Sequence, residues 1–545
     1  MEKVYTVTLK NRDDLEDFYA EMSSKGFRLH MKRPISRNTN YYMTQEQADE
    51  LKKDSRVIDV EPIDNFIAKP DAIYNNTPYT KNGTFYKTGS WPPATDFQWG
   101  HIHAGSASQI GEGSFGYGGS TGSKTTSVDV FNNGKHVDVI IIDEPMAYDS
   151  EEWKSPSSGN SRFVQYQWFN ELSSIVDTID DDGVTPLTGN ITYHQNSALS
   201  DYHGQHVGGT VAGKHYGWAN EANIYSIAYL SPGFHSGQTI SGWLIYDYLR
   251  AFHLHKAVNP VTGRRNPTVT QHSYGGIFYL NPEEEALSFS KLISVNYRGT
   301  TYNSGNPGPS GWTQAGVTAD FGVRFDITTY PAYHAGLVAD IQDAIDDGVV
   351  FSASAGNDNL LIAEPSDADW NNQITFEYTS GDNRTNYYNR GHWPATPDTD
   401  AVIVGALGNN SDFGRASFSM FGPSVDVYAP GVRILSCYGN TGTNDTKYSS
   451  GNYYGLASGT SMAGPQVAGV AATLATAKPR FTNSDLKGYL QRHSKYNDMP
   501  SGTVPNKYLI SKNPRSTSGM IEDVKGERKT SGMTFPRRAT LNYVA

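Results

Sequence analysis

Three residues whose side chains could cooperate in nucleophilic catalysis stand at the end of a predicted strand or at the start of a predicted helix. One of them is Ser461, which lies two residues after Gly459 in a small-residue stretch, residues 458–469, that predicts a tight turn running into a helix. At a helix start, unpaired N–H groups and the positive end of the helix dipole face any anion that forms on an attacked carbonyl group. Ser461 is therefore a candidate nucleophile, although a serine that only caps the helix fits the same local pattern.

An imidazole and a carboxylate that could activate this hydroxyl group lie upstream. His203 starts a second small-residue stretch and is a candidate general base. Residues 137–143 form an apolar run typical of a buried strand. The run ends in Asp143, at the carboxyl edge of a parallel sheet, where this carboxylate could orient the ring. No glutamate lies between His203 and His206, as a metallopeptidase motif would need, so we expect His206 to pack against its helix.

Four sequence blocks around these residues resemble those of the subtilisin-like serine peptidases. HGQHVGGTVAG (203–213) is similar to that family's HGTHVAGT, and GTSMAGP (459–465) is similar to its GTSMASP. VVFSASAGN (349–357) resembles its strand ending in AGN, and residues 401–431 resemble its VGA, ASFS and DVxAPG blocks. Because the blocks occur in the family's order, the resemblance is specific, and it covers residues 97–495 with insertions.

The resemblance implies a serine endopeptidase with an α/β fold, in which a mostly parallel sheet carries helices on both faces. Ser461 would attack the peptide carbonyl group, His203 would take the proton and return it, and Asp143 would hold the ring, in the chain order that subtilisin also has. Asn357 would donate to the oxyanion together with the N–H group of Ser461. A simple loop asparagine is the alternative interpretation of Asn357.

The same resemblance assigns substrate contacts to two segments. VTQHSYGG (269–276) resembles the SLGG segment that forms one edge of the family's substrate groove, and it predicts an edge strand that pairs with an extended peptide. An ordinary strand followed by a glycine turn is the alternative. The residues that we expect against the substrate are Ser273, Tyr274, Gly275, Gly276, Ala355 and Gly356.

One departure from the family's pattern concerns the carboxylate. The family usually follows its aspartate with Ser or Thr and then Gly, whereas Glu144 and Pro145 follow Asp143 here. A second carboxylate beside the first could raise a pKa or weaken the bond that orients the ring. This departure, together with the insertions and the tail, motivates a second hypothesis: a catalytically impaired subtilisin-like fold that serves as a structural or binding module.

The N-terminal residues predict a separate small unit. Residues 1–66 show a β-α-β-β-α-β alternation, with one helix over residues 12–25 and a second helix capped by Thr44. This ferredoxin-like α+β unit resembles the propeptide of subtilisin-like enzymes. The resemblance implies a self-inhibited precursor in which the N-terminal unit is an intramolecular inhibitor and residues 65–69 lie in the cleft. A small domain that stays attached and inhibits nothing is the alternative.

The remaining residues divide into a linker, a long domain and a tail. Residues 67–96 are rich in Asn, Thr, Pro, Gly and Tyr without a period and predict a linker. The peptidase-like domain over residues 97–495 carries insertions near 278–334 and 360–393, which we expect beside the cleft. Residues 496–545 predict a polar, locally basic tail.

Composition narrows the classes of partner. The chain has 545 residues, of which 37% are hydrophobic, so it can build a large core, and its net charge of −12 argues against general affinity for nucleic acid. No apolar run reaches the length of a membrane-spanning helix, and the first residues lack the apolar centre of a classical signal peptide. We therefore expect protein or peptide substrates, and neither nucleic acid nor membrane as a partner.

Cofactors have no role in the expected mechanism. The single cysteine, Cys437, excludes disulfides within the chain and predicts a small buried side chain. The acidic run 177–183 does not fit an EF-hand, because Thr178 and Gly189 stand where carboxylate ligands should be. The family resemblance leaves structural calcium open, with ligands that the sequence does not assign. The richness in Gly, Asn and Tyr also resembles subtilisin-like proteins of tailed bacteriophages, which implies a role in the virion.

Overall fold

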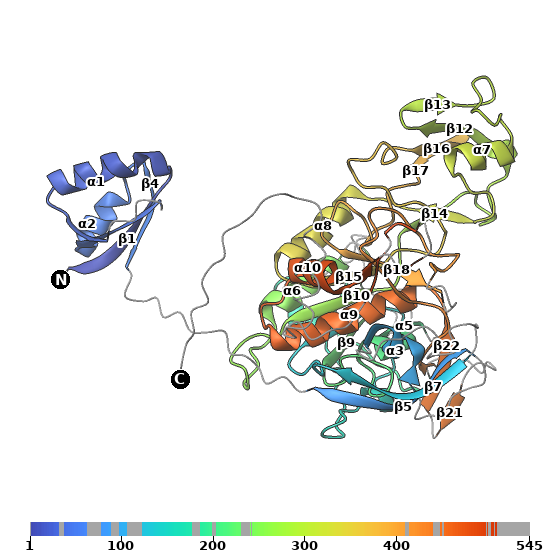
Figure 1. Ribbon diagram of the computed structural model, residues 1–545, viewed down its shortest axis with the longest axis horizontal. Helices are drawn as coiled ribbons and strands as arrows, with labels where there is room; N and C mark the ends of the chain where they lie inside the picture. Colours follow the sequence, from blue (N-terminus) through green and yellow to red (C-terminus); the bar gives the residue numbers. More distant parts are fainter. Residues whose placement is uncertain are drawn as a thin grey trace. The chain divides into compact units, whose positions relative to one another are not determined.

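The computed structural model of the chain contains two compact units, Met1–Ile73 and Tyr74–Ala545 (Figure 1). The residues that the structure describes are 2–31, 37–62, 78–88, 97–105, 122–176, 186–198, 203–229, 240, 242, 244–408, 414–439, 447–449, 452–496, 499, 503–505 and 507–509. The predicted cleft-binding stretch 65–69 and the acidic run 177–183 lie outside these described residues, as do most residues of the predicted linker and tail. The described residues of these two segments differ from the prediction: Tyr79–Thr88 of the linker form a strand, and Lys507–Tyr508 of the tail join the main sheet.

The N-terminal unit is an antiparallel sheet with two helices packed against it. Its elements are β1 (Lys3–Leu9), a 3-10 turn (Arg12–Asp14), α1 (Leu15–Ser24), β2 (Arg28–Met31), β3 (Asn38–Met43), α2 (Gln45–Leu51) and β4 (Val57–Pro62). The strands follow the order β2-β3-β1-β4. Alternate residues of β1, such as Val7, share a core with Phe18 and Met22 of α1.

The start of α2 shows why the alternation could be recognised in the sequence. The Thr44 hydroxyl accepts a hydrogen bond from the N–H group of Gln47, and the Gln47 side chain accepts one from the N–H group of Thr44. This capping box satisfies two N–H groups that a helix start leaves unpaired. The predicted cap and the β-α-β-β-α-β order are both confirmed for this unit.

The larger unit is built around an eight-stranded sheet, in which seven strands run parallel. In spatial order the strands are β23 (Lys495–Tyr496), β24 (Lys507–Tyr508), β19 (Val427–Pro430), β18 (Val402–Leu407), β15 (Val350–Ser354), β10 (Thr268–His272), β8 (Asp138–Asp143) and β9 (Asn223–Ala228). Strands β8, β10, β15 and β18 are buried at every residue, because both faces of the sheet are covered.

Helices cover both faces, and neighbouring strand residues show which helix covers which face (Figure 1). On one face, α9 (Thr460–Ala477) approaches β10 so closely that a Cβ atom on Gly464 would lie 2.5 Å from the Gln271 side chain. The next residue along β10, His272, points to the other face and stacks on Phe351. There α6 (Ile245–His255) contributes Tyr246, whose ring contacts both. The expected α/β fold with helices on both faces is confirmed.

The other helices and strands of the core surround this sheet. They are β5 (Tyr79–Thr88), β6 (Phe97–Gln98), α3 (Trp99–Gly105), β7 (Gly122–Val130), a 3-10 turn (Glu151–Trp153), α4 (Trp168–Leu172), α5 (His203–Ala212), α8 (Ala335–Asp346), β20 (Ile434–Tyr438), β21 (Lys447–Ser449), β22 (Asn452–Ala457) and α10 (Asn483–His493). Helix α5 packs against α9, and α6 packs against α8. Two smaller sheets have the strand orders β6-β5-β7 and β20-β22-β21.

The two predicted insertions form one structural lobe, at the upper right of Figure 1. The first contains β11 (Ile277–Tyr279), a 3-10 turn (Phe289–Lys291), β12 (Leu292–Tyr297), β13 (Thr300–Tyr302), α7 (Gln314–Phe321) and β14 (Thr329–Pro331), and the second contains β16 (Gln373–Thr379) and β17 (Asp382–Tyr387). Strand β12 pairs with β16, which joins both insertions in one sheet of order β13-β12-β16-β17. Phe321, Ile374 and Phe376 belong to the core beneath it.

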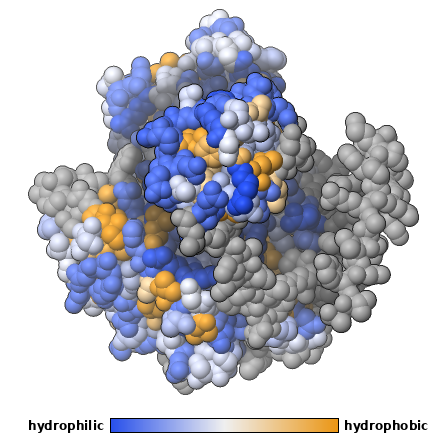
Figure 2. All heavy atoms as spheres, turned by 90° about the vertical axis from the view of Figure 1, so that its left-hand side faces the viewer, coloured by the Kyte–Doolittle hydropathy of each residue, from blue (hydrophilic) through white to orange (hydrophobic). Residues whose placement is uncertain are grey.

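Three features that the composition led us to expect can be checked in the structure: membrane-spanning helices, the hydropathy of the surface and the burial of the single cysteine. None of the helices in the described part of the chain combines the length and the apolar character that crossing a membrane requires. Among the coloured residues in Figure 2, most are hydrophilic, and the hydrophobic ones occur in separate patches. Cys437 is buried and carries a free thiol group, as predicted.

Candidate active site

The predicted carboxylate and imidazole meet where β8 ends and α5 begins. Asp143 is completely buried, and its Oδ1 atom lies 2.6 Å from Nδ1 of His203. Because a carboxylate only accepts hydrogen bonds, Nδ1 is the donor, and Nε2 of the neutral ring is left as an acceptor. The structure therefore brings these two residues together in the arrangement that a general base requires.

The surroundings of His203 favour its protonated form. Burial by itself would lower the pKa of the ring, but the charge and hydrogen bond of Asp143, with the charge of Glu144, outweigh burial and raise the pKa above its ordinary value. The second oxygen of Asp143, Oδ2, is buried and has no hydrogen-bond partner within the described part of the chain. The carboxylate thus directs its charge mainly to the ring and to the Glu144 N–H group, which donates to Oδ1 at 2.7 Å.

Glu144, the departure from the family's pattern, has a defined structural role. Its Oε2 atom accepts a hydrogen bond from the backbone N–H group of His203 at 2.8 Å and so caps the start of α5. The helix start lies so close that a Cβ atom on Gly204 would come within 2.2 Å of the Glu144 carbonyl oxygen. Glu144 therefore binds the backbone of His203, and Asp143 binds its ring.

Ser461 is the second residue of α9 and lies 9% exposed beside the end of β10. Its hydroxyl group donates to the carbonyl oxygen of Ser273 at 3.1 Å, and the Ser273 hydroxyl group donates to the carbonyl oxygen of Ser461 at 2.9 Å. This reciprocal pair ties the start of α9 to the segment after β10. Ser461 therefore donates to Ser273 and not to His203 in this arrangement.

Two N–H donors flank the space next to Ser461. The Asn357 Oδ1 atom accepts from both the N–H group and the hydroxyl group of Thr460, at 2.9 Å and 3.0 Å, which fixes its amide. A Cβ atom placed on Gly459 would lie 3.6 Å from Nδ2 of Asn357 and 3.5 Å from the backbone nitrogen of Ser461. The first N–H groups of a helix have no acceptor within the helix, so the Ser461 N–H group can donate to an atom outside it. An oxygen atom in this space could accept from both the Ser461 N–H group and Asn357 Nδ2.

Thr460 is a site residue that the sequence analysis missed. It fixes the orientation of Asn357, and its hydroxyl oxygen also accepts a hydrogen bond from the N–H group of Gly356 at 3.2 Å. The signal was present, because Thr460 lies inside the GTSMAGP block next to Ser461. Its role became visible only with the segment around Asn357, about a hundred residues upstream, in place.

The predicted substrate-binding residues 273–276 follow β10, which is an inner strand of the sheet and not the expected edge strand. Pairing of residues 273–275 with a peptide stays a prediction. Strand β10 pairs with β8 on one side and with β15 on the other, so it lies inside the sheet. Residues 273–276 continue beyond it. The Gly276 N–H group donates to the carbonyl oxygen of Trp393, and the Gly276 carbonyl oxygen accepts from Ala332, so neither group is available to a peptide.

The other members of the predicted set are mostly buried. Tyr274 packs its ring against Tyr229 and Trp393. Ala355 is completely buried and extends the pairing of the sheet through a hydrogen bond from its N–H group to the carbonyl oxygen of Val404. Gly356 has a φ of 108°, a conformation that favours glycine, and it leads the chain into Asn357.

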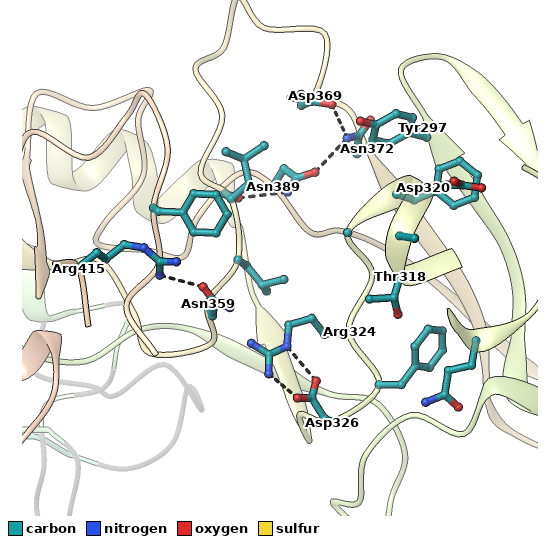
Figure 3. Close-up of a pocket in the computed structure, with 18 residues that line it drawn as sticks. Tyr297, Thr318, Asp320, Arg324, Asp326, Asn359, Asp369, Asn372, Asn389 and Arg415 are labelled. Carbon is teal, nitrogen blue, oxygen red and sulfur yellow. Dashed lines mark hydrogen bonds and ion pairs between the residues drawn. The ribbon is translucent and has the colours of Figure 1, made fainter. Parts of the chain in front are cut away.

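A separate cavity lies between the inserted lobe and the core (Figure 3). It has a volume of about 700 Å³, and its lining includes the Arg324–Asp326 ion pair and Arg415, which donates to Asn359 at 2.8 Å. None of the predicted catalytic residues lines it. The predicted catalytic residues therefore lie apart from this cavity.

Metal binding finds no support among the described residues, where no group of three or more His, Cys, Asp or Glu side chains could hold an ion. Ligands for the structural calcium that the resemblance leaves open are therefore not assigned. His206 is completely buried, its Nε2 atom lies 2.8 Å from the carbonyl oxygen of Ile434, and burial lowers its pKa to about 3. It packs inside the protein, as predicted.

Comparison with known proteins shows which family this chain belongs to and which proteins its sequence resembles. Residues 100–508 match the model of the subtilase family. The chain is 30% identical over 229 residues to subtilisin amylosacchariticus of Bacillus subtilis subsp. amylosacchariticus, covering 41% of this chain and 50% of that protein. It is 39% identical over 100 residues to a thermostable alkaline protease of Halalkalibacterium halodurans, covering 18% of this chain and 24% of that protein. The chain spans about half the length of the first of these relatives.

Among solved structures, the crystal structure of a cold adapted subtilisin-like serine proteinase matches with a TM-score of 0.41 and 23% sequence identity. This match covers 70% of the present chain and 92% of that chain.

Proposed function

The chain belongs to the subtilase family, and we propose that it is a serine endopeptidase that hydrolyses peptide bonds with Asp143, His203 and Ser461. The observation that carries this proposal is the 2.6 Å contact between Asp143 Oδ1 and His203 Nδ1 at the start of α5, which packs against α9, the helix whose second residue is Ser461. The family membership gives this geometry its meaning, because a buried carboxylate–imidazole pair also occurs as a purely structural element.

The mechanism follows from the donors and acceptors of these residues. The Ser461 hydroxyl group turns from the carbonyl oxygen of Ser273 toward Nε2 of His203 and attacks the substrate carbonyl carbon, while its proton passes to Nε2. Asp143 stabilises the imidazolium that forms. The negative oxygen of the tetrahedral intermediate lies between Asn357 Nδ2 and the N–H group of Ser461.

The intermediate then collapses. The C–N bond of the substrate breaks, the departing amine takes the proton from Nε2, and the acyl group remains as an ester on Ser461. Water repeats the attack with His203 as the base, and the ester bond breaks to release the acid and restore the serine. Since the base must be neutral, and the pKa of His203 is raised, the rate rises with pH through this raised value and not through the ordinary one.

We also propose that the N-terminal unit acts as an intramolecular inhibitor in a precursor form. Its support is the resemblance of its sequence to the family's propeptide and its separate compact fold of β-α-β-β-α-β order.

One observation favours the second candidate function, a subtilisin-like fold without activity. The Ser461 hydroxyl group donates to Ser273 and not to His203, so the nucleophile and the base are not yet connected.

Labelling with a fluorophosphonate probe separates the two functions. We expect the probe to bond covalently to Ser461, with the modified peptide identified by mass spectrometry, and we expect no label on a Ser461→Ala control. The labelling should be repeated after limited proteolysis that releases the N-terminal unit, because an inhibited precursor reacts slowly. Absence of label on Ser461 under both conditions, in a folded protein, would establish the inactive module. The same samples show whether the chain cleaves itself near residues 65–97.

A further inference from the structure

Two glycines face the place where a substrate residue must lie. If the attacked carbonyl carbon bonds to Ser461 and its oxygen lies near Asn357, the residue that carries this carbonyl group lies next to both. Its Cβ atom lies only about 2.5 Å from the reacting carbon, because both atoms are bonded to the same Cα atom. The neighbouring segments are residues 273–275, of which Ser273 is hydrogen-bonded to Ser461, and Gly356, which precedes Asn357. The side chain before the scissile bond must therefore enter between these two segments.

The imidazole ring of His392 occupies part of the space between these segments. A Cβ atom on Gly275 would lie 2.1 Å from Nδ1 of His392, and a Cβ atom on Gly356 would lie 2.9 Å from Nε2 of the same ring. The imidazole ring of His392 is thus placed between the two glycines, and the residue is only 4% exposed. The ring of His392 fits here because neither Gly275 nor Gly356 has a side chain.

Trp393, the residue after His392, packs in the same way against Gly276. A Cβ atom on Gly276 would lie 2.0 Å from Nε1 of Trp393, and the Trp393 ring contacts Tyr274 and Tyr229. The carbonyl oxygen of Trp393 accepts from Gly276, which fixes its backbone to the same segment. His392 and Trp393 end the second insertion, so this insertion delivers two large rings to the substrate-binding segments.

We propose that His392 restricts the peptidase to substrates with a small side chain, Gly, Ala or Ser, before the scissile bond. This inference rests on the proposed function and names its substrate class. The ring leaves room for a hydrogen atom or a methyl group between Gly275 and Gly356, but not for a leucine or phenylalanine side chain. Burial lowers the pKa of His392, so the ring is neutral and does not attract an acidic side chain by charge.

The test is the cleavage of peptides that differ only in the residue before the scissile bond, with Ala, Ser, Leu and Phe compared by kcat/KM. For the unaltered protein we expect Ala to exceed Phe by about 100-fold or more, since a hydrophobic pocket discriminates by roughly 10- to 200-fold per methylene group. His392→Gly should open the space between Gly275 and Gly356, raise kcat/KM for Phe and reduce this ratio by at least about tenfold. His392→Ala should give an intermediate ratio.

A matched control removes an imidazole elsewhere. His253 on α6 hydrogen-bonds Thr268 and lies outside the substrate-binding segments, so His253→Ala should leave the Ala-to-Phe ratio unchanged. Comparable cleavage after Phe and Ala by the unaltered protein would overturn the inference while leaving the peptidase function in place. A small-residue preference that His392→Gly and His392→Ala both leave unchanged would also overturn it. If the fluorophosphonate does not label Ser461 and no peptide is cleaved, the proposed function itself fails, and the inference fails with it.

Discussion

Two buried carboxylates hold histidine rings at the two ends of helix α5, and the two pairs have the same geometry. At its start, Asp143 Oδ1 lies 2.6 Å from Nδ1 of His203. Just beyond its end, Glu152 Oε1 lies 2.6 Å from Nδ1 of His215. Both carboxylates are completely buried, and both rings reach the surface in part. Only the first pair belongs to the proposed active site.

The difference lies in what surrounds each pair. Helix α5, which begins with His203, packs against α9, where the hydroxyl and N–H groups of Ser461 lie. Asn357 is hydrogen-bonded to Thr460 at the start of α9. Around the second pair the fold places cations. Lys81, whose pKa is lowered to about 7 by burial, donates to the carbonyl oxygen of His215, and Arg162 donates to that of Glu152.

The second oxygen of each carboxylate shows the same contrast. Glu152 Oε2 accepts from the backbone N–H group of His215, so both oxygens serve one residue and tie the chain together. Asp143 Oδ2 has no hydrogen-bond partner among the described residues. A carboxylate–imidazole bond is thus a structural element that this fold uses twice. Under the proposed function, only the first pair acts in catalysis, together with Ser461 and its oxyanion donors.

Removing the rings should have the largest and most unequal effect. His203→Ala removes the proposed base, and we expect kcat to fall by a factor on the order of 10⁶. His215→Ala should leave kcat within a few-fold and lower the midpoint of thermal unfolding, because it leaves the buried Glu152 carboxylate without its partner. Steady-state kinetics and thermal melts of both variants test this. Equal losses of kcat would contradict the assignment.

Replacing the carboxylates by amides should produce the next largest difference. Asp143→Asn keeps the shape but favours the wrong tautomer of His203, so kcat should fall by about 10⁴. Glu152→Gln should change kcat little and reduce the free energy of unfolding by about 1–3 kcal/mol, because one buried hydrogen-bond partner is mismatched. Urea unfolding beside kinetics separates the two. A larger kcat loss in Glu152→Gln than in Asp143→Asn would invert the comparison.

The oxyanion donor is specific to the first pair. Asn357→Ala removes one donor from the developing negative charge, and kcat should fall by about 10²–10³ with KM nearly unchanged. Thr460→Val leaves Asn357 in place but removes the hydroxyl group that holds its amide, so a smaller kcat loss in the same direction is expected. A change confined to KM in Asn357→Ala would show that this residue only binds the ground state of the substrate.

The smallest effect concerns pH. Glu144 helps to raise the pKa of His203, so Glu144→Gln should lower this pKa and move the acidic limb of the pH–rate profile to lower pH, by less than about one pH unit. The matched control is Glu151→Gln, which removes a carboxylate beside the second pair and should leave the limb where it is. A shift toward higher pH in Glu144→Gln would contradict the electrostatic role of this carboxylate.

The parts of the site that the sequence predicted are those with local patterns. His203 and Ser461 each start a stretch of small residues, and Asp143 ends an apolar run, so the nearby chain determines the helix or the strand end that presents each side chain. The capping box at Thr44 belongs to the same class. These features need no knowledge of distant partners.

The parts that the sequence did not predict depend on contacts between distant segments. The pairing of β12 with β16 joins the two insertions in one sheet, and the sequence contains no local pattern that indicates this pairing. Strand β10 was expected at an edge and lies inside the sheet, because β8 and β15 come from other parts of the chain. The sequence predicts that Glu144 could raise a pKa or weaken the bond to the His203 ring. In the structure Glu144 caps α5, a role that depends on the contact with His203, about sixty residues later in the chain.

The link between Ser461 and His203 is the central claim, and a double-mutant cycle tests it most directly. The kcat/KM values for one peptide substrate should be measured for the unaltered protein, Ser461→Ala, His203→Ala and the double variant. If the two residues act as a unit, the double variant loses no more activity than either single variant. Independent losses that multiply in the double variant, or nearly full activity in His203→Ala, would contradict the account.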